Sequence, residues 1–507
     1  MPSATERGER SVSPTDAAAH PVKPAQVFDR ETEWADLVGF ACDPRPGATL
    51  GLVSGQHRQG KTFLLEALAK AVGGFYFDGQ AAAEAETLQR LADRLGEHTR
   101  AADPPRWQRW EDAVDALLAL GDQHPALVII DNFPDLVGPS PALPSVVHGA
   151  YRRLHQVHRH NRARLILSGG APALMRRLFS APSSLHRLAS LELLVRPFDF
   201  RVAAQFWGIR SPRLAVQVHA VVGGTPAYRR DLVCDDAPTE PDDFDAWVCR
   251  TVLNPRVPLF WEARNLLEGE ANHADRALCH SALVAIAVGC STPGGIADRI
   301  GAPLTDVAHV LAVLQNRGLL HGEPDAFRPG LTRYRIAEPL LAFEHAVAWP
   351  HRAAIEQEDA AGVWRRVGTA FRSAVAAPHF AQLCRDWATE YAAPDTFGGH
   401  PETAVRGSIS DPAGHSRLDV DVAVRGTVDG RPGVLLSVGL ARWNETVDSH
   451  HLERLRHILS VLAASGEDVS QTRPGCYSAI GFGPELRAAE ARGEVLLVDA
   501  DRLYHGE

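Results

Sequence analysis

The sequence lacks several features that mark particular classes of protein. Only seven of its 507 residues are cysteine, the number is odd, and none forms a Cys-x-x-Cys pair. Scattered thiols of this kind argue against a disulfide framework or a zinc site and are typical of a reducing cytoplasm. No apolar run reaches the roughly 18 residues of a membrane-spanning helix, and the N-terminus lacks the apolar stretch of a signal peptide. We therefore expect a soluble, cytoplasmic protein with no membrane partner.

Positive charge is also in short supply. The chain has 52 Lys and Arg residues against 62 Asp and Glu residues, which gives a net charge of −10 and a pI near 6.1. This balance excludes a protein that coats nucleic acid or an anionic membrane by overall charge alone, although a local basic face is compatible with it. Apolar residues make up 45% of the chain, which is ample for packed cores, and the length suggests about three domains.

The sequence contains no internal repeat, so the domains are predicted from composition and periodicity. Residues 1–24 are rich in Ser, Thr, Pro and Ala without an apolar period, which predicts a disordered tail. Residues 25–235 alternate short apolar strands with amphipathic helices, which predicts an α/β domain with a parallel sheet covered on both faces. The predicted strands of this domain are 49–54, 74–77, 126–131 and 164–168.

Two further domains are predicted after this one. Residues 236–348 are mostly helical; three short helices over 282–320 and a strand at 332–336 outline a winged helix-turn-helix. Residues 349–507 begin with helices and continue as a small α/β unit. Its predicted elements are helices 363–375 and 380–391, strands 417–424 and 433–438, helix 450–463 and strand 494–498.

The strongest motif lies at residues 55–62, which read Gly-Gln-His-Arg-Gln-Gly-Lys-Thr. This is a complete phosphate-binding loop, G-x-x-x-x-G-K-[ST], and it stands between a predicted strand and a predicted helix as the motif requires. The glycines let backbone amides approach phosphate oxygens, and the following helix adds its positive end. Lys61 is expected to reach the β- and γ-phosphates and Thr62 to ligate Mg²⁺. The predicted nucleotide-binding residues of the loop are Gly55, Gln59, Gly60, Lys61, Thr62 and Phe63.

The expected catalytic residues follow the next strands. Asp131 ends an apolar strand, where it can hold Mg²⁺ through water or cap the next helix. Asn132 stands where many hydrolysing proteins have Glu; because Asn cannot accept a proton, slow hydrolysis is expected unless another acid such as Asp135 substitutes. Ser168 is either a sensor of the γ-phosphate or a small residue in a turn. Arg187 is either an arginine finger or a plain surface arginine.

Taken in order over residues 27–505, these motifs resemble the prokaryotic archaeal-type ATPases of the AAA+/STAND superfamily. The matching segments are 28–31, 55–62, 130–134, 165–169, 195–200, 223–228, 334–341, 418–424, 438–443 and 480–483. The resemblance implies a P-loop NTPase core, a winged helix and a restriction-endonuclease-like C-terminal domain. It also implies ATP with Mg²⁺ as the cofactor, with Arg30 and Pro226 near the adenine.

The C-terminal domain departs from the nuclease pattern that the resemblance implies. A nuclease of this type needs an Asp and then acid-x-Lys on the next strand, which together hold Mg²⁺ and orient water. Asp421, or Asp419, supplies the first acid. The second strand has Leu440 and Arg442 where relatives have Glu and Lys, and Arg is a poor substitute for Lys. Arg372 stands where relatives have Glu, so we expect a nuclease fold without a working metal site.

The predicted recognition helix of the winged helix, residues 305–316, is equally unusual. It contains Asp306 and His309 but no Lys or Arg before Arg317, whereas readers of DNA usually place several basic residues against phosphates. The sequence therefore supports double-stranded DNA binding and a packing or partner-binding role equally, and it allows a homo-oligomer. The function predicted is a nucleotide-dependent switch with weak ATPase activity. The alternatives are an ATP-controlled nuclease effector of a defence system and a non-enzymatic scaffold.

Overall fold

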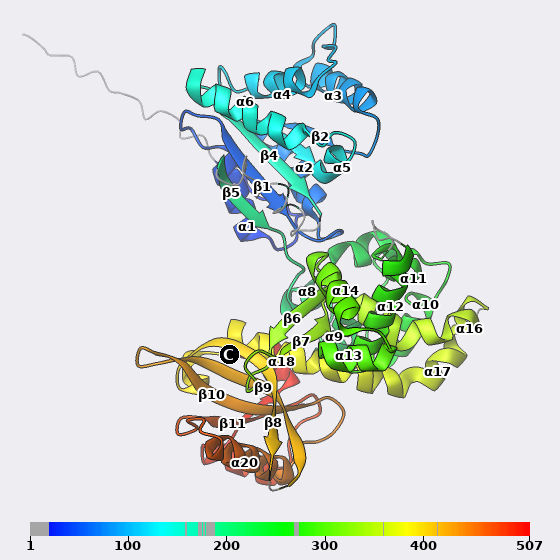
Figure 1. Cartoon of the computed structure of the whole chain (residues 1–507), viewed down its shortest axis with the longest axis vertical. Coiled ribbons are helices and arrows are strands. Elements are labelled where there is room, and N and C mark those ends of the chain that lie inside the picture. The colour runs from blue at the N-terminus through cyan, green and yellow to red at the C-terminus, as the bar shows by residue number, and fades with distance from the viewer. Residues whose placement is uncertain are drawn as a thin grey trace, which may run out of the picture. The chain divides into compact units, whose positions relative to one another are not determined.

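The structure is a computed structural model that describes residues 20–157, 160–170, 175, 178, 188–267, 273–357, 359–412 and 414–506. The chain divides into two compact units (Figure 1). The first comprises Met1–Gly55, Lys61–Gly170 and Met175–Val195. The second comprises Gln56–Gly60, Ala171–Leu174 and Arg196–Glu507, so the variable residues of the phosphate loop belong to it.

The first unit is built on a parallel five-stranded sheet of order β2-β3-β4-β1-β5. Side chains alternate between the two faces of a strand, so Val128 and Ile130 of β3 join one core while Leu127 and Ile129 join the other. The strands are β1 (Thr49–Ser54), β2 (Phe75–Asp78), β3 (Ala126–Asp131), β4 (Ala163–Gly169) and β5 (Ala189–Leu194). The sheet therefore has one hydrophobic core on each face.

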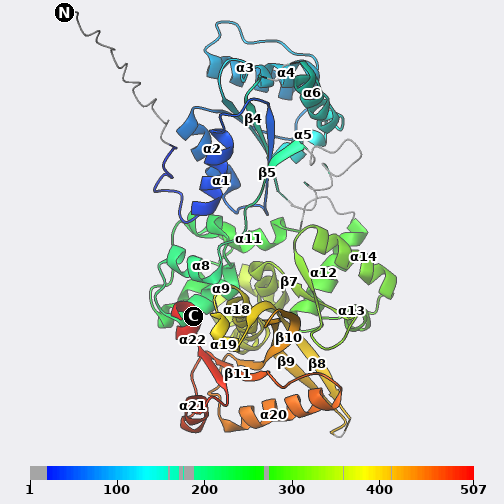
Figure 2. The same ribbon diagram turned by 90° about the vertical axis from the view of Figure 1, so that its left-hand side faces the viewer.

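Helices cover both of these faces. Helices α1 and α2 pack on one core, and α3, α4 and α6 pack on the other (Figure 2). The helices are α1 (Glu31–Ala41), α2 (Lys61–Val72), α3 (Glu84–Thr99), α4 (Trp110–Ala119), α5 (Phe133–Val137) and α6 (Leu143–Val157). Because α2 begins at Lys61, within the phosphate-binding motif that follows β1, its N-terminus lies at the carboxyl end of the sheet.

The second unit begins with a helical region. Asp199 caps α8 by accepting hydrogen bonds from two backbone amides, and Ser211 caps α9 ahead of a proline at its first position. The helices are α8 (Phe200–Trp207), α9 (Pro212–Val222), α10 (Phe244–Arg250), α11 (Pro258–Asn265), α12 (His273–Ala287), α13 (Pro293–Ile300) and α14 (Leu304–Asn316). The antiparallel hairpin β6 (Leu320–Pro324) and β7 (Thr332–Ile336) follows these helices.

The C-terminal part of the second unit is a mixed sheet of order β12-β11-β10-β9-β8. Strands β8, β9 and β10 are antiparallel, whereas β10, β11 and β12 are parallel. Helix α18 packs on one face and α20 on the other (Figure 2). The strands are β8 (His400–Asp411), β9 (Ser416–Val428), β10 (Arg431–Arg442), β11 (Arg473–Ser478) and β12 (Leu496–Asp499).

Further helices of the second unit follow the hairpin in the sequence. They are α15 (Pro339–Phe343), α16 (Arg352–Glu356), α17 (Ala360–Ala370), the π-helical turn η6 (Phe371–Ala376), α18 (Ala377–Glu390), α19 (Pro394–Phe397), α20 (Ser449–Ala464), α21 (Pro484–Ala491) and α22 (Ala500–His505). Among the residues described, no helix combines the length and the apolar character that crossing a membrane requires.

The hairpin β6–β7, which is the predicted wing, packs against the C-terminal sheet. Ala326 and Phe327 at its tip belong to the same hydrophobic cluster as the core beneath that sheet. The backbone amide of Ala326 donates to the carbonyl of Arg406 in β8 at 3.1 Å. A Cβ on Gly407 would lie 2.6 Å from the Phe327 ring, so only glycine fits under the wing at that position.

The α/β architecture expected from the sequence is confirmed in outline: a parallel sheet core, a helical middle region and a smaller C-terminal sheet. The sequence did not predict β5, β6, β8 or β11. Strand β5 lies at the edge of its sheet with no residue fully buried, and β8 is an edge strand with a largely polar first half. Edge strands of this kind carry too weak an apolar pattern to be recognised.

Candidate phosphate-binding site

Two glycines set the path of the phosphate loop between β1 and α2. Gly55 follows β1 where the chain passes close to β5, and a Cβ at this position would lie 2.4 Å from the carbonyl oxygen of Val195. Gly60 has φ +84°, in the left-handed region that glycine adopts without steric cost. Both glycines of the motif are therefore required by the backbone itself.

Lys61 is buried at the first position of α2 with only 6% of its surface exposed. Its Nζ donates to the carbonyl oxygen of Gly55 at 2.9 Å. Burial lowers the pKa of Lys61 to about 8, against an opposing effect of the Asp131 carboxylate. A phosphate oxygen next to Nζ would relieve this cost, because opposite charge favours the protonated amine.

Asp131 lies fully buried at the end of β3 and accepts hydrogen bonds from neutral donors. Its carboxylate accepts from the Thr62 hydroxyl at 2.6 Å, from the Tyr76 hydroxyl at 3.0 Å and from the Asn132 amide at 2.9 Å. Burial and this carboxylate together raise the pKa of Tyr76. Tyr76 could not be recognised from the sequence, since an aromatic residue in a strand is usually a core residue. A hydroxyl beside a carboxylate is the kind of oxygen donor set that Mg²⁺ prefers, so these residues fit that ion.

The side chain of Asn132 is held by a neighbouring strand end. Asn132 has φ 51° in the left-handed region, and its Nδ2 donates to the Asp78 carboxylate at 2.8 Å. Asp78 ends β2, which pairs with β3 so that Asp78 and Asp131 stand opposite each other. The structure thus places a second carboxylate, that of Asp78, beside the predicted catalytic residues Asp131 and Asn132. Sequence reasoning missed this residue.

Ser168 lies at the end of β4 and is completely buried. Its hydroxyl oxygen has no hydrogen-bond partner among the described residues. A buried hydroxyl without a partner is uncommon, and one way to satisfy it is a ligand. Arg187, the predicted arginine finger, falls outside the residues that the structure describes.

The other predicted nucleotide contacts divide between the units. In the first unit, Arg30 stands before α1 with φ 72° and is 8% exposed, and it forms an ion pair with Glu33 at 2.7 Å. The Phe63 ring is half exposed. In the second unit, the Gln59 side chain donates to the Thr225 hydroxyl at 3.0 Å. Pro226 lies beside the loop, because its Cγ would be 3.8 Å from a Cβ on Gly60.

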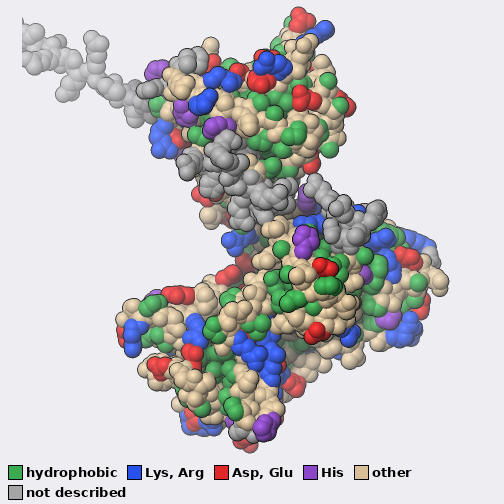
Figure 3. Space-filling model, viewed as in Figure 1, with side chains coloured by type: hydrophobic (Ala, Val, Ile, Leu, Met, Phe, Trp, Pro, Cys, Tyr) green, Lys and Arg blue, Asp and Glu red, His purple; other side chains and the backbone are tan. Residues whose placement is uncertain are grey.

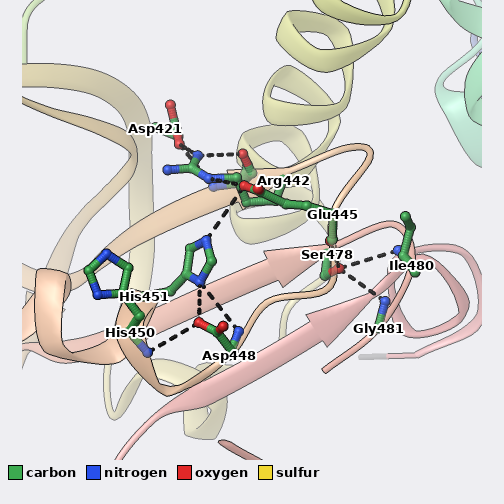
Figure 4. Close-up of polar contacts among 10 residues, drawn as sticks. Asp421, Arg442, Glu445, Asp448, His450, His451, Ser478, Ile480 and Gly481 are labelled. Carbon is green, nitrogen blue, oxygen red and sulfur yellow. Dashed lines mark hydrogen bonds and ion pairs between the residues drawn. The ribbon is translucent and has the colours of Figure 1, made fainter. Parts of the chain in front are cut away.

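The C-terminal sheet of the second unit has a different arrangement around Asp421 (Figure 4). The Asp421 carboxylate accepts from the Ala441 amide and from Arg442 Nη1, each at 2.9 Å. Arg442 Nε also pairs with Glu445 at 2.9 Å. Asp419 pairs with Arg417 at 3.4 Å instead. A guanidinium therefore bonds to the carboxylate that the nuclease pattern assigns to the metal.

The same network continues through His451, whose two ring nitrogens lie near two acids (Figure 4). Nε2 is 3.5 Å from Glu445 and Nδ1 is 3.0 Å from Asp448, which caps α20. Leu440, where relatives carry an acid, is buried in the core of the sheet. Within the described part of the chain, no group of three or more His, Cys, Asp or Glu residues is placed to hold a metal ion.

The basic residues of the wing make contacts inside the second unit. Arg333 is buried and pairs with Asp325 at 2.6 Å, and it also donates to the Ser408 hydroxyl of β8 at 2.8 Å. Arg335 pairs with Glu323 at 2.6 Å. Figure 3 shows a compact group of basic side chains over the region where the wing meets β8 and β9. Arg333 thus helps to hold the hairpin on the C-terminal sheet, whereas Arg335 pairs within the hairpin.

No family model matches the chain, and no curated protein matches it. Among solved structures, a Walker-type ATPase of Pyrococcus abyssi is 20% identical, with 63% of this chain and 96% of that chain covered and a TM-score of 0.46. The ORC2 protein of Aeropyrum pernix in ADPNP–ADP complexes is 16% identical, with 68% and 97% covered and a TM-score of 0.46. The ORC1 protein of Aeropyrum pernix in complex with DNA is 15% identical, with 66% and 95% covered and a TM-score of 0.32. These values describe a likeness to those structures and assign no function.

Proposed function

We propose that the protein binds ATP with Mg²⁺ at residues 55–62 and acts as a nucleotide-dependent switch with slow hydrolysis. The observation that carries this proposal is the 2.6 Å contact between the Thr62 hydroxyl and the Asp131 carboxylate, beside a buried Lys61. Lys61 would neutralise phosphate charge, and Thr62 and Asp131 would hold the ion. Bound Mg²⁺ would supply charge neutralisation of the phosphates. The unpartnered hydroxyl of Ser168 suits a sensor of the terminal phosphate.

Slow hydrolysis is supported by the position of Asn132. An amide cannot accept a proton from water, and this amide already donates to Asp78. Asn132 contacts two carboxylates, Asp131, which would be occupied by the ion, and Asp78. We therefore propose that Asp78 supports whatever turnover remains, while Asp135 and Arg187 stay predictions.

The experiment that tests binding and turnover together is Mg²⁺-dependent ATP hydrolysis by the purified protein, with and without double-stranded DNA, beside Lys61→Ala. Tight binding with almost no turnover, lost in Lys61→Ala, is the expected result. Residual turnover that falls in Asp78→Asn would assign the base. Fast turnover in the wild-type protein would contradict the slow switch, and absence of ATP binding would contradict the nucleotide site altogether.

For the output of the switch, we propose that the winged helix binds a protein partner in preference to DNA. The wing arginines are engaged by Asp325, Glu323 and Ser408. Helix α14 has an acid, Asp306, in its first turn and no basic residue in its last turn. A fluorescence anisotropy titration with double-stranded DNA over a salt series decides this: strong binding with a steep salt dependence would favour DNA instead.

We propose that the nuclease-like domain does not cleave nucleic acid, because Arg442 neutralises Asp421. Incubation with plasmid and Mg²⁺ or Mn²⁺ should leave the plasmid intact. Cutting that is abolished by Asp421→Ala would establish the nuclease alternative. The scaffold alternative instead predicts that Lys61→Ala leaves partner binding intact and only lowers the melting temperature.

A further inference from the structure

The phosphate loop makes two hydrogen bonds through glutamine side chains within the second unit, to which residues 56–60 belong. Gln56 Nε2 donates to the carbonyl oxygen of Gly318 at 2.5 Å, in the turn between α14 and β6. Gln59 Nε2 donates to the hydroxyl of Thr225 at 3.0 Å, just after α9. The loop is thereby attached to the end of the predicted recognition helix and to a turn of the helical region.

A third contact is an ion pair that involves a buried acid. Arg58 Nε donates to Glu262 Oε1 on α11 at 2.5 Å, and the Glu262 side chain is 3% exposed. Arg58 also has φ 65°, a left-handed conformation that non-glycine residues adopt only when their surroundings fix it. A buried carboxylate needs a charged or hydrogen-bonding partner. The contact with Arg58 therefore stabilises both the Glu262 carboxylate and the backbone conformation of the loop.

Two more ionisable groups lie beside this pair. Tyr228 is buried, and its pKa is raised by burial and by the neighbouring Glu338 and Glu262, whereas Arg58 opposes that shift. Glu338, which is 5% exposed just before α15, is hydrogen-bonded to Tyr228, and burial raises its pKa to about 7. Arg58 therefore brings positive charge to a region where two acids are buried. Moving Arg58 away would leave Glu262 next to a second acid without that compensation.

We propose that the Arg58–Glu262 ion pair, with the contacts of Gln56 and Gln59, couples occupation of the phosphate loop to the end of α14. The proposal rests on the proposed nucleotide site. A phosphate held by the loop amides would fix the backbone of residues 56–60, and the three side chains would pass that constraint to α11, Thr225 and Gly318. Glu262 is then a positioning residue that acts on the nucleotide site through Arg58.

A double-mutant cycle on the full chain tests the coupling. Affinity for fluorescent ADP would be measured for Arg58→Ala, Glu262→Gln, the double variant and the matched control Glu97→Gln, whose exposed partner Arg94 lies 2.8 Å away in α3. Each single variant should bind about tenfold more weakly, and the double variant no worse than either, because both remove one link. The control should stay within about twofold. Fully additive losses would overturn the proposal.

Hydrogen exchange supplies a readout that a merely structural role would not move. In the wild-type protein, nucleotide should slow amide exchange in residues 314–320 about tenfold, and in Glu262→Gln nucleotide should leave it unchanged. Arg58→Lys keeps the positive charge, so in this variant nucleotide should still slow exchange in residues 314–320 in part. This variant replaces Arg58→Ala if Arg58→Ala does not fold. An equal nucleotide effect in wild type and Glu262→Gln would contradict the coupling.

The proposed function and this inference fail in different ways. If the wild-type protein binds no nucleotide, the proposed function is wrong. The ion pair is then tested in the protein without nucleotide, where Arg58→Ala and Glu262→Gln should raise exchange in residues 314–320 to the same extent. Unchanged exchange in both variants would show that Arg58 and Glu262 have no link to α14.

Discussion

Asp131 and Asp421 are acids on strands of two different sheets, and their partners differ in charge. The hydrogen-bond donors to Asp131 are hydroxyl and amide groups, all neutral, and the Lys61 amine acts on it electrostatically. Asp421 accepts from a backbone amide and from the guanidinium of Arg442. Neutral donors leave the charge of a carboxylate available for a cation, whereas a guanidinium cancels it. The residue type alone therefore does not predict a metal site; the charge of the neighbours decides.

The largest expected effect concerns the lysine beside Asp131. Lys61→Ala should weaken ATP binding about 100-fold, roughly 3 kcal/mol, because it removes a buried charge from the phosphates. Isothermal titration calorimetry measures this, with Lys70→Ala as the control, since Lys70 lies on the same helix and its side chain is 81% exposed. A loss of the same size in both variants would show that the charge of α2, and not the loop, attracts the nucleotide.

The comparison of the two acids is tested directly by matched substitutions. Asp131→Asn should reduce the gain in ATP affinity that Mg²⁺ provides by about tenfold, or ~1.4 kcal/mol. Asp421→Asn should leave that gain unchanged, because its carboxylate is already paired with Arg442. The measurement is ATP affinity with and without Mg²⁺. An equal response of the two variants would remove the distinction drawn between the sites.

The pH dependence of nucleotide binding tests the charge of Lys61, which lies beside Asp131. Because the pKa of Lys61 is lowered to about 8 in the folded protein, nucleotide affinity should fall as pH rises above 8, by up to about tenfold per pH unit. Lys61→Arg stays charged and should show no such fall. The free energy of unfolding should instead rise between pH 8 and 10.5. In that range Lys61 has lost its proton in the folded protein, whereas the unfolded chain still binds it. A flat binding profile from pH 7 to 9.5 would contradict the lowered pKa.

The smallest effect is expected at the ion pair that replaces a metal. Arg442→Ala should lower the free energy of unfolding by only about 0.5–1 kcal/mol, since the Arg442 and Asp421 side chains are 22% and 30% exposed. Arg417→Ala, which removes a more exposed pair with Asp419, should cost less still. Urea unfolding of both variants measures the difference. A loss of several kcal/mol in Arg442→Ala would mean that the network is a major element of stability.

The features that could be predicted from the sequence are those encoded by a local pattern. The apolar runs of β1, β3 and β4 predicted the central strands, and the spacing of glycines, Lys61 and Thr62 predicted the phosphate loop. Sequence reasoning missed Tyr76 and Asp78, because they reach Asp131 and Asn132 only through the pairing of β2 with β3. Contacts between distant segments depend on strand order, which no local period encodes. The assignment of roles to Asn132, Ser168 and Arg187 stays a prediction.

The same limit applies to the wing. The composition of the predicted recognition helix, residues 305–316, left DNA binding and a packing or partner-binding role equally supported. Only the fold reveals that Arg333 and its partner Asp325 meet Ser408, which lies 75 residues from Arg333 along the chain. An arginine that holds two parts of a unit together and one that meets a phosphate look alike in a sequence, because both follow the same wing pattern.

The docking of the wing on β8 also bears on how the protein behaves at high concentration. Strand β8 is the last strand of its sheet, and an uncovered edge offers unpaired backbone groups to a strand of another molecule. The backbone amide of Ala326 donates a hydrogen bond to the Arg406 carbonyl, and the Phe327 ring covers Gly407. A chain shortened to remove the wing would uncover this edge, and it should aggregate by strand addition long before the rest of the fold is lost.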